Sequence, residues 1–123
     1  MKYLIATSLV CLLWPDMLLA SENNLGYTKN PLIEPRKSYE ACMWLSPGDR
    51  LYYKFTSSAD LRFNIHYHEG NEVRYPVPVK LISFEEVVFE PESRNHYCLM
   101  WSNPLKKRVE LKLNYQIRNS GDK

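Results

Sequence analysis

The histidines His66 and His68 have the spacing with the clearest chemical potential in this sequence. Side chains two residues apart on a β-strand point to the same face, so both imidazoles can reach one metal ion. Neutral imidazole is a ligand of Zn²⁺ and Cu²⁺, and His96, Glu69 or Glu72 could supply a third ligand. A small zinc- or copper-binding protein is therefore one hypothesis. The alternative is a pair of histidines on a solvated strand face, because no second ligand motif stands at a defined spacing.

Groups for other kinds of catalysis are few. No serine occupies a Gly-x-Ser-x-Gly motif, and the four glycines do not form a phosphate-binding loop. Glu85, Glu86, Glu90 and Glu92 form two acidic pairs. A glycosidase holds two carboxylates across a cleft, for which a chain of this length has little room. We interpret the four carboxylates as solvated charges at strand edges and predict that the protein is not an enzyme.

The cysteine count predicts one disulfide. Cys11 lies in an N-terminal apolar segment that we expect to be removed, which leaves Cys42 and Cys98. An even pair in an exported domain usually forms a disulfide. This bond would leave no free thiolate to act as a nucleophile. Two buried free thiols are the alternative.

The first twenty residues have the layout of a secretory signal peptide. Met1 and Lys2 form a short positive region, and residues 4–14 are apolar except at two positions. Cleavage is expected after Ala20, which would remove residues 1–20 and leave a periplasmic or secreted protein. The apolar run is too short to span a bilayer, which takes about 20 residues, and an uncleaved anchor is the alternative. We expect no transmembrane segment in the mature chain, because no second apolar run follows.

The composition is that of one globular domain. Of the 123 residues, 45% are hydrophobic, 13% aromatic and 24% charged, a balance that excludes a disordered chain. The length allows one domain and excludes a multidomain enzyme. A net charge of +2 is too small to indicate nucleic-acid binding. We interpret the basic run at residues 106–108 as a solubilising turn.

Alternation of apolar and polar residues predicts β-strands. Residues 61–68 place apolar side chains on one face and polar side chains on the other, and residues 109–117 alternate in the same way. Residues 51–55 form a shorter strand with three apolar positions on one face. Roughly six to eight short strands with regular turn signals predict a single small antiparallel β-sandwich.

Turn signals divide these strands and set the domain boundaries. The Pro-Gly pair at 47–48 predicts a type II turn, because glycine accepts a positive φ. Residues 57–60 predict a break, and residues 69–72 predict a hairpin connection. Pro76 and Pro78 confine their strand to an edge or a bend. The boundaries that follow are a lead-in at 21–38, a sandwich at 39–118 and a polar tail at 119–123.

A contact patch for a partner is predicted on the polar faces of two strands. Tyr52 shares the outer parity of its strand and would be exposed near Arg62, His66 and His68. Aromatic residues are enriched in interface cores, and an exposed sheet edge can accept a partner strand. The partner would be a protein or a component of the cell envelope. The alternative is that Tyr52 is an ordinary sheet-surface tyrosine.

The order of the segments resembles a known family. Residues 39–51 join a cysteine strand to a Gly-containing turn, and residues 59–65 form an alternating strand led by an aspartate. Residues 96–103 form a second cysteine strand ahead of the closing strand at 109–117. This order resembles the GOLD (Golgi dynamics) domain, the luminal β-sandwich of cargo receptors in the early secretory pathway.

The resemblance implies a β-sandwich, a bridge between Cys42 and Cys98, contacts with proteins or lipids, and no catalytic residues. GOLD cargo receptors continue into a coiled coil, a membrane helix and a sorting tail, which this sequence does not show, so we do not expect cargo sorting. A compact signal and a free-standing domain fit a bacterial periplasmic protein better than a eukaryotic receptor. We therefore predict an exported, non-enzymatic binding module without a cofactor, with copper or zinc binding as the alternative.

Overall fold

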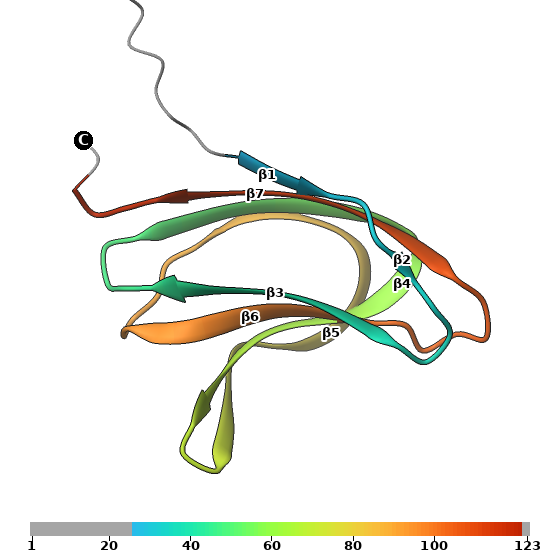
Figure 1. Ribbon diagram of the computed structural model, residues 1–123, viewed down its shortest axis with the longest axis horizontal. Helices are drawn as coiled ribbons and strands as arrows, with labels where there is room; N and C mark the ends of the chain where they lie inside the picture. Colours follow the sequence, from blue (N-terminus) through green and yellow to red (C-terminus); the bar gives the residue numbers. More distant parts are fainter. Residues whose placement is uncertain (1–25, 122–123) are drawn as a thin grey trace, which may run out of the picture.

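The computed structural model describes residues 26–121, whose regular secondary structure is entirely β-strand (Figure 1). All strand pairings are antiparallel, which confirms the predicted all-β fold. None of these residues belongs to a helix that could cross a membrane. The strands are β1 (Gly26–Lys29), β2 (Leu32–Ile33), β3 (Ser38–Leu45), β4 (Arg50–Glu69), β5 (Glu72–Phe89), β6 (Asn95–Ser102) and β7 (Val109–Arg118).

The N-terminal part of the described chain is built into the sheet. The expected signal peptide, residues 1–20, lies outside the described residues. Within the expected lead-in, residues 21–38, β1 and β2 both pair with β7. The sheet therefore extends from residue 26, ahead of the sandwich boundary that the sequence suggests at residue 39.

β4 and β5 form one long hairpin that belongs to both layers of the sandwich. Residues 50–57 of β4 pair with β7, whereas residues 62–66 pair with β6. β5 follows β4 along both parts. One layer therefore has the order β1–β7–β4–β5 and the other has the order β3–β6–β4–β5. The two layers are stacked in Figure 1, and the tip of the hairpin projects below them.

The chain does not break at residues 57–60, where the sequence predicts an interruption. β4 continues through these residues, and its register with β5 shifts between Thr56 and Leu61. An irregularity of this kind bends a strand and increases its twist. The Ser57 hydroxyl donates to the Ala59 carbonyl across 2.6 Å, which satisfies a polar group at the bend. These small residues therefore direct the strand from one layer into the other instead of ending it.

The core lies between the layers. Phe63 and Ile65 are fully buried, as the alternation predicts. The Trp101 ring of β6 lies 5.4 Å from the Phe55 ring and 5.2 Å from the Phe63 ring, measured between centroids. Phe55 belongs to the part of β4 that pairs with β7, and Phe63 belongs to the part that pairs with β6. These aromatic contacts therefore join the two layers, and such pairs stabilise beyond their buried area.

The predicted disulfide and both predicted turns are present. Cys42 of β3 and Cys98 of β6 are directly opposite in register and are bonded. Gly48 has a φ of +92°, and the turn closes with a 3.0 Å hydrogen bond from the Asp49 amide, as a type II turn requires. Gly70, with a φ of +60°, is the first residue of the two-residue loop between β4 and β5. This position needs a positive φ in a type II′ hairpin.

We predict that Cys42→Ala/Cys98→Ala lowers the free energy of unfolding by up to about 4 kcal/mol, because the bond spans 56 residues and restricts the unfolded chain. Urea denaturation followed by tryptophan fluorescence measures the change. Wild-type protein reduced with dithiothreitol is the matched control and should unfold at the same urea concentration as the variant. An unchanged midpoint in both would show that the disulfide does not stabilise this fold.

Candidate functional site

His66 lies on the outer face of the β6-containing layer, but it is only 6% exposed. Its Nδ1 atom is 2.7 Å from Asn64 Oδ1, and because an amide oxygen accepts, the imidazole donates this hydrogen bond. Its Nε2 atom lies 3.7 Å from Glu40 Oε1. The rings of His68 and Tyr75 lie 5.5 Å and 6.0 Å from the His66 ring. His66 is therefore enclosed by side chains from three strands, in contrast to a solvated strand face.

Burial lowers the pKa of His66 below its ordinary value of 6.5. The Glu40 carboxylate acts in the opposite direction, and His68 acts in the same direction as burial. The folded state therefore favours the neutral imidazole. The enclosure depends on Tyr75, which comes close to His66 where the β4–β5 register is irregular between Ile65 and Tyr67. Strand alternation does not reveal this irregularity.

The three histidines do not assemble the metal site that their sequence suggests. Among residues 26–121, the group of three ligand atoms that lie within 4.8 Å of one another comes from Glu40, Cys42 and Cys98, and both sulfurs are in the disulfide. His96 packs its ring against Trp44, with centroids 5.2 Å apart. The geometry therefore does not favour copper or zinc binding at these positions.

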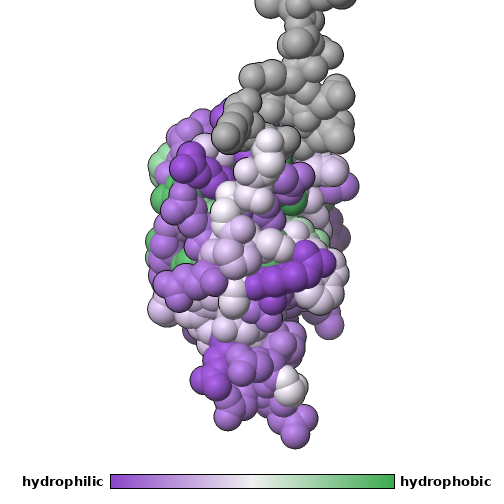
Figure 2. Space-filling view, turned by 90° about the vertical axis from the view of Figure 1, so that its left-hand side faces the viewer, coloured by the Kyte–Doolittle hydropathy of each residue, from purple (hydrophilic) through white to green (hydrophobic). Residues whose placement is uncertain are grey.

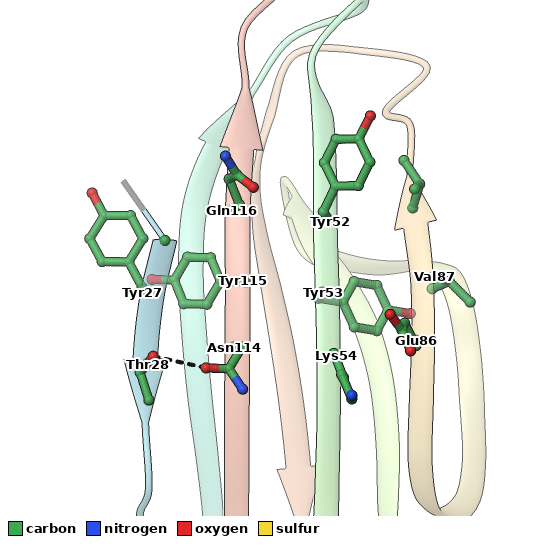
Figure 3. A pocket seen from close by; sticks show the side chains of 12 residues that line it. Tyr27, Thr28, Tyr52, Tyr53, Lys54, Glu86, Val87, Asn114, Tyr115 and Gln116 are labelled. Atoms are coloured by element: carbon green, nitrogen blue, oxygen red, sulfur yellow. Dashed lines mark hydrogen bonds between the residues drawn. The ribbon is translucent and has the colours of Figure 1, made fainter. Parts of the chain in front are cut away.

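A hollow of about 430 Å³ lies along the β1–β7–β4–β5 layer (Figure 3). Gly26 leaves space opposite Gln116 because it has no side chain. Tyr52 lines this hollow, and the Arg118 guanidinium lies 5.1 Å from the centre of its ring. Residues 86–88 of β5 also line it. The hollow therefore connects the surface of β4 to the edge of the sheet.

The predicted contact residues lie in two places. Tyr52 belongs to the part of β4 that pairs with β7, whereas Arg62 and His66 belong to the part that pairs with β6. Arg62 and His68 are exposed. Because the outer faces of the two layers point away from each other, Tyr52 does not form one patch with the histidines.

Glu85 is not the solvated charge that we expected from the sequence. Its side chain is only 15% exposed, and it forms an ion pair with Lys80. The Tyr53 hydroxyl donates to its carboxylate across 3.0 Å. Burial, together with this carboxylate, raises the pKa of Tyr53 far above its ordinary value. The sequence contained one signal, because Glu85 has the parity of Phe89; the structure then places it opposite the buried Phe55.

β5 carries most of the exposed large apolar side chains of the described chain. It is an edge strand in both layers, since its pairing within residues 26–121 is with β4. Exposed apolar side chains gathered on one strand mark a candidate interaction site. Seven of the ten such side chains belong to β5, namely Val73, Tyr75, Val79, Leu81, Phe84, Val87 and Val88.

Comparison with known proteins gives the fold and no family. No protein-family model matches this chain, and no curated protein matches it. Among solved structures, the periplasmic lysozyme inhibitor PliG of Aeromonas hydrophila, which inhibits g-type lysozyme, matches with a TM-score of 0.54 at 12% identity. The match covers 76% of this chain and 86% of the inhibitor.

A second solved structure has the same architecture. The Yersinia pseudotuberculosis-derived mitogen YPM matches with a TM-score of 0.52 at 17% identity, over 74% of this chain and 84% of the mitogen. At these identities the two structures support a small all-β fold and nothing beyond the fold. Neither structure is described as a GOLD domain, so these comparisons do not confirm the resemblance to the GOLD family.

We predict that the protein loses stability as the pH falls below about 6.5, because the unfolded state then binds a proton that folded His66 resists. The contribution of His66 to the free energy of unfolding is complete at pH values above its pKa in the unfolded state, and it decreases as the pH falls below that pKa. His66→Gln should therefore reduce the change in unfolding free energy between pH 7.5 and pH 5. Urea denaturation at each pH measures this.

His96→Gln is the control, because His96 is exposed and packs against Trp44 only at the surface. It should leave the pH dependence close to that of the wild type. Equal pH dependence in wild type and His66→Gln would contradict the assignment to His66.

Proposed function

We propose that this protein is an exported, non-enzymatic, GOLD-like β-sandwich that binds another protein through β5 and the adjoining hollow. The observation that carries the proposal is the concentration of exposed apolar side chains on one edge strand. Leu81 is 57% exposed and Phe84 is 55% exposed. Fully burying an exposed side chain of this size contributes about 1.5–3 kcal/mol, and these side chains, already nearly half buried, would contribute roughly half of that before the costs of association.

The two halves of β5 differ in how they can bind. Pro76 and Pro78 lack the N–H that a neighbouring strand would need, so the first half cannot accept a regular partner strand. Residues 79–89 contain no proline and can extend the sheet by pairing with a strand of the partner. The exposed side chains of Phe84 and Val88, on the same face as Tyr52, would then provide the specificity of this contact, and Leu81 lies further along β5 beyond the bend.

Export is supported by two observations. The bond between Cys42 and Cys98 is typical of oxidising compartments, and residues 1–20 have the pattern of a signal peptide. The fold is shared with a periplasmic inhibitor.

Of the predicted contact residues, we retain Tyr52, because it lines the hollow next to β5.

We predict that Leu81→Ser/Phe84→Ser weakens binding to the partner by at least about tenfold, because apolar anchors dominate interface energy. Wild-type and variant proteins are immobilised, proteins are captured from an extract of the source organism, and the affinity of the captured protein is measured by surface plasmon resonance. Leu32→Ser is the matched control, since Leu32 of β2 is 59% exposed and lies off β5. Equal capture by all three proteins would contradict the assignment to β5.

A purified g-type lysozyme is the first defined partner to test, because the PliG protein is described as an inhibitor of that enzyme. Binding that the β5 variant loses and the Leu32→Ser control keeps would identify the partner. Absence of binding would exclude g-type lysozyme as the partner.

A further inference from the structure

A second hollow, of about 480 Å³, lies where the β4–β5 hairpin leaves the sandwich. Its walls come from β4, β5, β6 and the loop between β5 and β6. The hairpin that borders it projects below the layers in Figure 1, and Figure 2 shows that the projecting tip is hydrophilic. Its volume is within the range of small-ligand sites. We call it the end pocket.

Three aromatic rings pack against one another in the wall of the end pocket. Tyr97 is 1% exposed, and its hydroxyl donates to the Ser93 carbonyl across 2.6 Å, which fixes the ring. The Tyr67 ring stands at 71° to the Tyr97 ring with centroids 5.3 Å apart. The Phe89 ring stands at 66° to it, also at 5.3 Å. Tyr75 contributes a fourth ring to the lining.

The charge around these rings is negative. Arg74 lines the end pocket, but its guanidinium is bound by Glu72 at 2.5 Å and faces Glu69 at 3.8 Å. These three residues therefore carry a net charge of −1. Because both carboxylates already face the guanidinium, Arg74 is poorly placed to bind an anion.

The opposite wall adds further negative charge. Glu90 forms an ion pair with Arg50 at 3.1 Å. Glu92, the residue before Ser93, lines the end pocket and is exposed. Among the charged residues that line the end pocket itself, Arg74, Glu90 and Glu92 sum to −1.

We propose that the end pocket binds a lysine or arginine side chain of the protein partner. A cation is attracted to the faces of aromatic rings, and this attraction increases when the ring is desolvated. The Glu92 carboxylate pairs with the charged group, while the alkyl part of the side chain packs against the accessible faces of the Tyr67 and Tyr75 rings. Since β5 supplies wall residues to this pocket and to the first hollow, one partner can contact both. This inference rests on the proposed protein-binding function and specifies the chemistry of one contact.

The test uses a defined probe and does not require the partner. Nα-acetyl-L-arginine amide is titrated into the ¹⁵N-labelled protein, and amide chemical shifts are followed by NMR. The uncharged isostere Nα-acetyl-L-citrulline amide is the matched ligand control. We expect saturable shifts at Tyr67, Phe89, Glu92 and Ser93 with the arginine probe and no saturable shifts there with citrulline. Equal shifts with both probes, or no saturable shifts with arginine, would overturn the proposal.

Variants separate the rings from the carboxylate. Tyr67→Leu should weaken arginine binding by about threefold or more, because it removes a ring face, and Glu92→Gln should weaken it by up to about fivefold. Glu110→Gln is the control, because Glu110 is exposed on β7 and lies outside the end-pocket lining. Unchanged affinity in both pocket variants would overturn the proposal.

Inorganic phosphate tests the opposite charge preference. Phosphate that shifts the same amides at lower concentrations than the arginine probe would show an anion site at Arg74 and overturn the proposal. None of these outcomes depends on Leu81 or Phe84. Failure of the end pocket is therefore distinguishable from failure of the protein-binding surface.

Discussion

The pairing of β4 with three other strands is the constraint on which the rest of this structure depends. A strand has two edges, so it can pair with three strands only if its neighbour changes along its length. The bend at residues 57–60 produces that change from β7 to β6. It places Phe55 and Phe63 in different layers around Trp101, and it makes β5 an edge strand of both layers. The core and the proposed binding surface are therefore consequences of the same bend.

Buried polar residues hold the ends of the sandwich without involving β5. Asn103 is 2% exposed and donates to the carbonyls of Ile33 and Lys107 at 3.0 Å and 2.7 Å, which joins the β2 segment to the β6–β7 turn. Asp49 accepts from the Ser120 amide at 3.1 Å and joins the β3–β4 turn to the C-terminal end of β7. These buried polar groups find their hydrogen-bond partners without using β5. The exposed side chains of β5 therefore remain available for the proposed partner.

Local patterns in the sequence were sufficient for the fold class and insufficient for the site. Alternation at residues 61–67 and 109–117 identifies strands and their inward faces, and the two cysteines identify their bond, because these signals need only neighbouring residues or simple counting. The continuity of β4 and the burial of His66 depend on which strands become neighbours and on register shifts between them. The burial of Glu85 also depends on these pairings. Its parity along the strand indicated the inner face, whereas its charge suggested exposure to solvent. Exposure along β5 follows from its position at the edge, which the sequence indicated only through Pro76 and Pro78.

The pairing of β1 and β2 with β7 has a consequence for the order in which the chain can fold. Residues 26–33 have no partner in the sheet until residues 109–116 have been synthesised or translocated. Likewise, Cys42 cannot form its native disulfide until Cys98 has been synthesised or translocated. A chain that emerges from its N-terminus therefore exposes its first strands until almost its whole length is available, and non-local pairing of this kind folds slowly. The domain can therefore be completed only when β7, the last strand, is available for pairing.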